Sequence, residues 1–316
     1  MCREGPLTWW NEWVIALVCP GQGSQKPGFL TEWLAVPGVP EHLAQLSDAA
    51  GLDLAHYGTE ADEDTIKDTA VAQPLIVAAG LLAGRLIAPQ LEGRSDVVLA
   101  GHSVGEITAA ALAGVLTEAE AMRFVRVRAT EMAAAAAATP TGMAAVLGGT
   151  PEDVAAAVSA VGATAANANG GGQVVAAGTI EQLDALAENP PTRAKVVRLK
   201  VAGAFHTEHM APALQPLRNL VPELSPQDPE HALLSNHDGA RTTSGAAFLD
   251  SLVEQVCRPV RWDACMATLS DMDVTQIVEL PPAGTLVGLA KRGLKGVPAT
   301  AVSTPQDLDQ VRSTLA

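Results

Sequence analysis

The stretch Val97-Val98-Leu99-Ala100-Gly101-His102-Ser103-Val104-Gly105-Glu106-Ile107 decides the fold of this 316-residue chain. A short apolar run breaks into Gly-x-Ser-x-Gly and then resumes as an alanine-rich helical pattern. This order of strand, sharp turn and helix is typical of a nucleophile elbow, in which the serine backbone is strained and its hydroxyl is exposed. Gly101 and Gly105 keep Cβ atoms out of the crowded turn. Ser103 is therefore the candidate nucleophile, and the alternative is an ordinary glycine turn that contains a serine.

The composition predicts a layered α/β fold. Hydrophobic residues make up 48% of the chain but aromatic residues only 3%, so the core must consist of Ala, Val and Leu in closely packed helices and strands. The length of 316 residues fits one large domain, or a large domain that carries a small one, at about 100–200 residues per domain.

Charge and cysteine content restrict the partners and the location. The net charge of −15 argues against nucleic acid and anionic membrane surfaces, which require a basic patch. No run of about 18 continuous apolar residues is present, so we expect a soluble protein. Residues 1–13, with three of the five tryptophans, are expected to form a poorly ordered extension rather than a signal peptide. Four cysteines without Cys-x-x-Cys spacing indicate reduced thiols in a cytoplasmic protein: Cys2, Cys19, Cys257 and Cys265.

The apolar run at residues 14–18 predicts a buried strand that ends in a glycine loop, Cys19-Pro20-Gly21-Gln22-Gly23-Ser24-Gln25. Loops after parallel strands line the binding crevice of an α/β sheet. The backbone of Gln22, between two glycines, can approach a ligand closely, although an ordinary strand-to-helix turn explains the pattern equally well. Helices are predicted at residues 41–57 and 71–88, the second opening near Ala72-Gln73-Pro74 with proline in its first turn.

Arg128 lies on the apolar face of a further predicted helix at residues 117–134, which begins at Thr117. Its neighbours on that face are Ala121, Phe124, Val125 and Met132, whereas Arg123 and Arg126 point away. A guanidinium in such a place needs an anion, because an unpaired buried charge costs several kcal/mol. The partner is either an internal Asp or Glu or a substrate carboxylate.

A second folding pattern begins after Ala138 and predicts an inserted ferredoxin-like unit. Strands are expected at residues 143–147, 164–169, 173–177 and 195–199, and helices at residues 151–161 and 180–188, in the order βαββαβ. Asn167 and Asn169 lie on the strand that leads to a triple glycine. We expect their side chains to point opposite ways, so that at least one of them reaches an adjoining cleft.

His206 is the best candidate for a general base. It ends the strand-like run at residues 201–207, where the chain returns to the large domain, in a place comparable to the loop of Ser103. A single histidine is more often a structural residue. A Ser–His pair also needs hydrogen-bond contact and a third group that fixes the tautomer.

Several motifs occur in an order that resembles the malonyl-CoA:acyl carrier protein transacylases, the acyltransferase family of bacterial fatty-acid and polyketide synthesis, and its actinobacterial type most closely. The resemblance extends from about residue 14 to the C-terminus. Its motifs are Pro20-Gly-Gln-Gly-Ser-Gln25, Gly101-His-Ser-Val-Gly105, Arg128, Asn167-Ala-Asn169, Gly203-Ala-Phe-His206, Ser235-Asn236, Gln255 with Pro259-Val260-x-Trp262, and Gly284-Thr-Leu-x-Gly-Leu-x-Lys-Arg292.

The resemblance implies an α/β-hydrolase-like large domain with a parallel sheet at residues 14–138 and 203–316. A ferredoxin-like subdomain at residues 139–202 is inserted into it, and the active site lies in the cleft between them. The implied catalytic residues are Ser103 as nucleophile, His206 as base and Gln255, which orients the imidazole through its side chain or its carbonyl. The N–H groups of Gln22 and Val104 are implied to form the oxyanion hole, and Arg128 to hold the malonyl carboxylate. Further substrate-binding residues implied are Phe205, Asn167, Asn169 and Asn236.

The implied reaction is ping-pong transfer of a malonyl group through a malonyl-serine ester, with malonyl-CoA and acyl carrier protein as partners and no metal or resident cofactor. We expect a monomer. Phe205 and Val104 follow the pattern of relatives that select malonyl over methylmalonyl units. The carrier protein is expected to dock on local basic residues: Arg193, Lys195, Arg198, Lys200, Lys291, Arg292 and Lys295.

Two departures from the family pattern, Arg258 and Pro281-Pro282-Ala283, concern the finer shape of the cleft. Two other functions also remain open. A serine acyl-hydrolase of the patatin or lipase type would place a carboxylate against His206. A non-catalytic module that binds carrier protein would keep only the fold.

Overall fold

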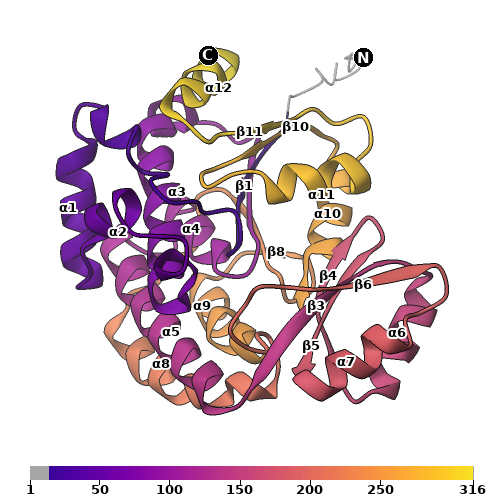
Figure 1. Cartoon of the computed structure of the whole chain (residues 1–316). Coiled ribbons are helices and arrows are strands. Elements are labelled where there is room, and N and C mark those ends of the chain that lie inside the picture. The colour runs from indigo at the N-terminus through magenta and orange to yellow at the C-terminus, as the bar shows by residue number, and fades with distance from the viewer. Residues whose placement is uncertain (1–13, 316) are drawn as a thin grey trace, which may run out of the picture.

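A computed structural model describes residues 14–315, and its α/β architecture agrees with the predicted fold class (Figure 1). The predicted poorly ordered extension at residues 1–13 lies outside the described residues, as does residue 316. The chain forms a large α/β domain around one sheet and a small domain, Thr141–Arg198, around a second sheet, at the lower right in Figure 1.

The sheet of the large domain has six strands in the order β11-β10-β1-β2-β7-β8. All neighbours in it are parallel except β7 and β8, which form an antiparallel edge. Continuous apolar strands such as β2 are buried on both faces, as parallel sheets require. The strand bounds are β1 Val14–Cys19, β2 Val97–Gly101, β7 Ala232–Leu234, β8 Arg241–Thr242, β10 Val274–Glu279 and β11 Ala299–Ala301.

Helices cover both faces of this sheet. Alternate side chains of β1 and β2 belong to two different apolar clusters. Leu17 and Leu99 pack with α3 (Thr69–Leu91), α4 (Gly105–Leu112) and α5 (Glu118–Ala138). Ala16 and Val98 pack with α10 (Trp262–Asp271) and α11 (Thr285–Gly293) on the opposite face. The carboxyl ends of β1 and β2 therefore open into loops between the two helical layers.

By length and composition α3 is long and apolar enough to cross a membrane, although the sequence shows no continuous apolar run of that length. In the fold, 78% of its most apolar window is buried. Such burial is typical of a central core helix, and Figure 1 shows α3 enclosed by neighbouring helices.

Three predicted elements differ in the structure. The helix predicted at residues 41–57 is two helices, α1 (Val39–Ala50) and α2 (Leu54–Thr59), because Gly51 takes a left-handed φ of 59° and ends the first. The helix predicted at residues 71–88 begins at Thr69, so Pro74 lies inside it rather than in its first turn. The strand-like run before His206 forms no strand.

The remaining elements of the large domain connect these layers. The predicted start of α5 is confirmed, with Thr117 and Glu120 in a reciprocal capping box. The other helices are α8 Leu214–Leu220, α9 Gly245–Glu254 and α12 Pro305–Leu315, with short 3-10 helices at Trp33–Ala35, Thr65–Lys67, Glu208–Ala213, Val221–Glu223 and Gln255–Cys257.

The small domain confirms the predicted βαββαβ order. Its sheet has the order β6-β3-β5-β4-β9. The neighbouring pairs β6 with β3, β3 with β5 and β5 with β4 are all antiparallel, and these four strands have the order of a ferredoxin-like fold. One strand from the large domain, β9, pairs parallel with β4 and joins the two domains. The bounds are β3 Thr141–Gly148, α6 Pro151–Ala160, β4 Thr164–Gly170, β5 Gln173–Thr179, α7 Ile180–Glu188, β6 Ala194–Arg198 and β9 Val260–Arg261.

The prediction that Asn167 and Asn169 point opposite ways is wrong. Both side chains line the same cavity, described below. Residues two apart on a strand share a face, and β4 follows this rule despite irregular pairing with β5 on either side of them.

Candidate active site

The turn after β2 has the geometry of a nucleophile elbow. Ser103 has a φ of 53°, a left-handed conformation that is strained for a residue with a side chain. A Cβ atom at Gly105 would overlap the carbonyl oxygen of Cys19, and one at Gly101 would overlap the backbone of Gly105 and Glu106. Only glycine fits at these two positions, and this confirms the reason for the Gly-x-Ser-x-Gly spacing.

Ser103 and His206 are brought into contact although they are far apart in the chain. Ser103 Oγ lies 2.7 Å from His206 Nε2, and His206 Nδ1 lies 2.9 Å from the carbonyl oxygen of Gln255. The carbonyl can only accept, so Nδ1 carries the proton and Nε2 is free to accept the serine proton. The backbone carbonyl of Gln255, and not its side chain, therefore orients the imidazole.

His206 is 3% exposed. Burial lowers the pKa of His206 to about 3, and the positive charge of Arg128 contributes to the same shift. A histidine with so low a pKa stays neutral at physiological pH, as a general base must.

Arg128 is buried as predicted, with an exposed fraction of 1%. Its Nη1 donates to Gln73 Oε1 at 2.6 Å, and its Nη2 donates to Gln255 Oε1 at 2.8 Å and to Ser103 Oγ at 3.3 Å. These acceptors are neutral, and within residues 14–315 no carboxylate forms an ion pair with Arg128. The guanidinium thus lies beside the nucleophile, although neither Arg128 nor Gln255 is among the residues that line the cavity in front of Ser103. A substrate carboxylate placed next to Ser103 can meet it.

The cavity in front of Ser103 has a volume of about 220 Å³ and combines residues of both domains. Phe205 precedes the base in the chain, lines the cavity and is 7% exposed. Asn167 Oδ1 is buried without a hydrogen-bond partner and is suited to accept from a ligand N–H or O–H. The lining residues are Gly21, Gln22, Gln73, His102, Ser103, Val104, Met132, Met143, Asn167, Asn169, Gln173, Val175, Leu199, Val201, Phe205, His206 and Thr285.

The backbone N–H groups of Gln22 and Val104, implied to form the oxyanion hole, come from loops after adjacent strands. Both residues line the cavity. Neither N–H donates a hydrogen bond to another atom in the described part of the chain. The Gln22 side chain is engaged elsewhere, because its Nε2 donates to Lys67 O at 3.1 Å.

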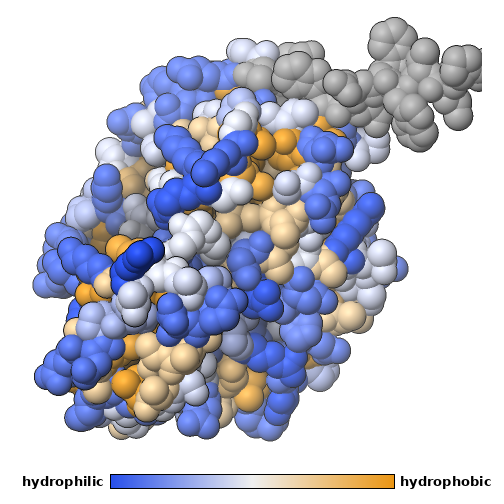
Figure 2. Space-filling view, turned by 90° about the vertical axis from the view of Figure 1, so that its right-hand side faces the viewer, coloured by the Kyte–Doolittle hydropathy of each residue, from blue (hydrophilic) through white to orange (hydrophobic). Residues whose placement is uncertain are grey.

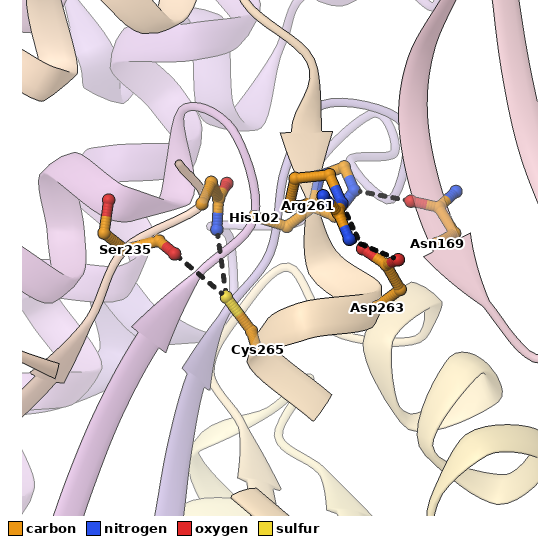
Figure 3. Close-up of polar contacts among 7 residues, drawn as sticks. His102, Asn169, Ser235, Arg261, Asp263 and Cys265 are labelled. Atoms are coloured by element: carbon orange, nitrogen blue, oxygen red, sulfur yellow. Dashed lines mark hydrogen bonds and ion pairs between the residues drawn. The ribbon is translucent and has the colours of Figure 1, made fainter. Parts of the chain in front are cut away.

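Asn169 does not point freely into the cavity. Its Oδ1 lies 2.9 Å from His102 Nε2, and Figure 3 shows this contact reaching from β4 of the small domain to the elbow. Burial lowers the pKa of His102, so its ring is neutral. Asn169 therefore fixes the residue that precedes the nucleophile and joins the two domains across the cavity.

Asn236 was expected to bind substrate, but the structure places it behind the elbow, outside the cavity lining. Its exposed fraction is 1%, its Oδ1 accepts from Ser103 N at 2.8 Å and its Nδ2 donates to Gly101 O at 2.7 Å. Nδ2 also contacts Cys265 Sγ on α10, which in turn donates to Ser235 O (Figure 3). With its polar atoms already paired, Asn236 braces the turn.

Sequence reasoning missed two polar side chains at the site. Gln73 on α3 is 3% exposed and accepts from Arg128. Glu106, in the first turn of α4, is 1% exposed. The available signal for Glu106 was its position as a charged residue in an otherwise apolar and alanine-rich helix next to the elbow.

The two departures from the family pattern lie outside the cavity lining. Arg258 is half exposed and forms an ion pair with Glu254 at 3.3 Å. Pro281, Pro282 and Ala283 are also absent from the lining residues.

The basic residues considered for docking lie on the small domain and on and just after α11. Arg198 is partly engaged by Asp184 at 2.7 Å, and Arg292 Nη2 donates to Gln173 Oε1 at 3.0 Å. Lys291 is exposed at the end of α11. Figure 2 views the molecule from the side of the small domain and shows polar residues over most of this face, with smaller apolar areas between them.

Comparison with known proteins gives consistent matches over almost the whole chain. Residues 16–311 match the family model of the acyl transferase domain. The chain is 53% identical to a malonyl CoA-acyl carrier protein transacylase of Mycobacterium bovis over 94% of this chain and 99% of that protein. The crystal structure of MCAT from Mycobacterium tuberculosis has a TM-score of 0.91 and 52% identity, over 95% of this chain and 99% of that one. A malonyl-transacylase in complex with its type II PKS acyl-carrier protein has a TM-score of 0.87 and 29% identity, over 95% of this chain and 99% of that one.

Proposed function

This chain belongs to the acyl transferase domain family, and we propose that it moves the malonyl group of malonyl-CoA to the phosphopantetheine thiol of acyl carrier protein. The family membership makes the protein an acyltransferase. The names of its relatives support malonyl-CoA as donor and acyl carrier protein as acceptor. In this proposal, the transfer supplies malonyl units to fatty-acid or polyketide synthesis.

One observation carries the proposal: a serine–histidine pair lines the cavity, and a buried guanidinium contacts the hydroxyl of that serine. Arg128 Nη2 lies 3.3 Å from Ser103 Oγ, which lies 2.7 Å from His206 Nε2. A substrate whose carboxylate and thioester are joined by one carbon can meet both groups at once. Malonyl-CoA has this arrangement, and acetyl-CoA does not.

In the first half-reaction, Ser103 attacks the thioester carbonyl while His206 takes its proton. The N–H groups of Gln22 and Val104 stabilise the oxyanion. The coenzyme A thiolate leaves and takes the proton back from His206, which gives a malonyl-serine ester. The Gln255 carbonyl keeps the imidazole in the required tautomer throughout.

In the second half-reaction, the phosphopantetheine thiol of the carrier protein replaces coenzyme A in the cavity. His206 takes the thiol proton, the thiolate attacks the ester, and Ser103 leaves with the proton. Since the first product departs before the second substrate reacts, the kinetics are ping-pong. The chain's own groups supply every step, so we propose no metal or resident cofactor.

The fit of the carboxyl group and of the acyl chain sets specificity. Arg128 forms charge-assisted hydrogen bonds with the malonyl carboxylate. Phe205 and Val104 fill space beside the reacting carbon and disfavour a methyl branch there. Asn167 and Asn169 line the approach from the small domain, the first with a free acceptor for the donor arm and the second through His102.

We place the domain boundaries at residues 14–138 with 203–316 and at residues 139–202, so that the two domains form opposite walls of the cavity. We further propose a cytoplasmic monomer. The three described cysteines are free thiols, which fits a reducing compartment. Because the chain is acidic, the carrier protein docks on local basic residues, with Lys291 and Arg292 as the leading candidates.

A transfer assay tests the proposal. Wild type should malonylate holo carrier protein and give parallel lines in double-reciprocal plots, whereas Ser103→Ala should give no transfer. Fast hydrolysis without transfer would instead favour an acyl-hydrolase. The structure argues against that function, because the partner of His206 Nδ1 is a backbone carbonyl and not a carboxylate. Carrier binding without turnover would favour a non-catalytic module.

A further inference from the structure

Glu106 is a buried carboxylate that the proposed reaction does not use. It lies in the first turn of α4, its backbone N–H donates to Ser103 O at 3.0 Å, and it is 1% exposed. An ionised side chain in such a place is costly unless its neighbours compensate for it. Its surroundings therefore call for an explanation beyond packing.

Both oxygens of Glu106 accept hydrogen bonds from fixed donors. Oε1 accepts from the backbone N–H of Asn236 at 2.6 Å, and Oε2 accepts from Gln255 Nε2 through a short contact. Burial raises the pKa of Glu106 to about 8, although these two donors and the charge of Arg128 oppose the shift. Both carboxyl oxygens face N–H donors, and this geometry fits the ionised form, which offers acceptors only.

The contact with Glu106 decides which way the Gln255 side-chain amide points. Gln255 Nε2 faces Glu106 and also donates to Ser103 O at 3.2 Å, so Oε1 must face the other way. There it accepts from Arg128 Nη2 at 2.8 Å. A reversed amide would present N–H groups to the guanidinium, which has only donors itself.

The same chain of contacts separates two opposite charges by one neutral amide. The negative charge of Glu106 favours the charged form of Arg128, against the effect of burial. Because the carboxylate touches Gln255 rather than the guanidinium, it occupies none of the N–H groups of Arg128. The guanidinium thus stays charged in the interior and remains open to an external carboxylate.

We propose that Glu106 is a positioning residue that fixes Arg128 for the substrate carboxylate through the side chain of Gln255. This inference rests on the proposed malonyl transfer. It assigns to Glu106 a part in substrate selection, and none in the proton transfers between Ser103 and His206.

Glu106→Gln tests the inference with almost no change in volume. The new side-chain amide can accept from the Asn236 N–H only if its NH₂ group faces Gln255. The Gln255 amide must then turn over, so that its Nε2 instead of its Oε1 faces Arg128. Loss of the hydrogen bond from the charged Arg128 to Gln255 Oε1 should lower the malonyl-to-acetyl ratio of kcat/KM about tenfold or more, mainly through KM for malonyl-CoA. The ratio is informative because both acyl groups use Ser103 and His206.

The matched control is Glu120→Gln. Glu120 is also a buried glutamate in the first turn of a helix, and its oxygens accept from the backbone N–H groups of Thr117 and Ser225. It lies outside the cavity lining. This control should lower the melting temperature and leave the acyl ratio at the wild-type value.

A double-mutant cycle separates positioning from general damage. In an Arg128→Ala background, Glu106→Gln should leave the acyl ratio unchanged, because its effect passes through Arg128. Should Glu106→Gln fail to fold, a double variant that combines Glu106→Gln with Gln255→Glu again pairs donors with acceptors at the Asn236 N–H and at Arg128, and gives up only the hydrogen bond to Ser103 O. That double variant should fold and still show a reduced ratio, because its carboxylate now occupies the guanidinium.

Four outcomes are decisive. A folded Glu106→Gln variant with the wild-type acyl ratio would overturn the inference, as would an equal drop in the Arg128→Ala background or a wild-type ratio in the exchanged double variant. Absence of any malonyl preference in wild type would instead refute the proposed function, and with it this inference. The acyl preference of wild type therefore distinguishes a failure of the proposed function from a failure of the inference about Glu106.

Discussion

Replacing Arg128 by alanine should convert the enzyme from a malonyl-selective to an acetyl-tolerant acyltransferase. The guanidinium is 1% exposed and lies 3.3 Å from the Ser103 hydroxyl, so a carboxylate bound there is shielded from water. Truncating one partner of a desolvated charge pair costs about 2–5 kcal/mol. This corresponds to a loss of about 30-fold to about 5,000-fold in kcat/KM for malonyl-CoA.

Acetyl transfer has no carboxylate to lose and should be retained or improved. The assay is the rate of acyl transfer to carrier protein from each donor, measured under the same conditions. The matched control is Arg126→Ala, because Arg126 lies on the same helix but is only partly buried and donates to Ala70 O at 3.2 Å. Its acyl ratio should equal that of wild type.

Removing Arg128 also takes a donor from two amide oxygens, on Gln73 and Gln255, and some loss of stability is expected at about 1–3 kcal/mol for a buried group left unpaired. Thermal unfolding and circular dichroism would measure it. A variant that is folded and keeps the wild-type acyl ratio would refute the carboxylate role. A variant that does not fold would show that Arg128 serves the interior instead.

Three further predictions concern the base, the acyl pocket and the carrier protein. Because burial and Arg128 lower the pKa of His206 to about 3, the base stays neutral, and the rate of Ser103 acylation should be nearly constant from about pH 8 to about pH 5; a decline centred near the ordinary histidine value of about 6.5 would show that His206 titrates normally. Phe205→Ser should reduce the preference for malonyl-CoA over methylmalonyl-CoA, which one methyl group limits to about 10–200-fold, and an unchanged ratio would remove the steric explanation. Charge reversal at Lys291 and Arg292 should raise KM for carrier protein more than KM for malonyl-CoA; equal changes would place docking elsewhere.

Local patterns in the sequence were sufficient to predict the elements that depend on neighbouring residues. The elbow at Gly101–Gly105, the capped start of α5 and the βαββαβ succession of elements in the small domain all follow from turn residues, caps and apolar periodicity. The burial of Arg128 also follows from its place on an apolar helical face. Each of these features depends on residues that lie within about one helical turn or one strand of it in the sequence.

Contacts between distant segments could not be predicted in the same way. Nothing near Asn236 shows that its side chain would accept from the Ser103 N–H rather than face a ligand, because the two residues meet only after β2 and β7 pair. The choice between the carbonyl and the side chain of Gln255 depends on how the 3-10 helix at Gln255–Cys257 packs against His206. The break at Gly51 needed the φ value that the turn adopts.

The resemblance to a known family carried the assignment of roles further than the residues alone could. Ser103 and Arg128 were candidates on physical grounds, whereas the oxyanion N–H groups and Gln255 came from the family pattern. In the structure, Ser103, Gln22 and Val104 line one cavity, and Arg128 and Gln255 contact Ser103 from outside that lining. For Glu106 neither the residue pattern nor the family resemblance predicted a role, and only the structure showed its contacts.

The covalent intermediate is the most direct test of the proposed reaction. Wild type is incubated with malonyl-CoA without carrier protein, quenched in acid, digested and mapped by mass spectrometry, with Ser103→Ala as the control. A malonyl ester on Ser103 that disappears when holo carrier protein is added, with the malonyl group recovered on the carrier, is the predicted result. Malonylated carrier protein formed without any adduct on Ser103, or by the Ser103→Ala variant, would contradict the serine mechanism.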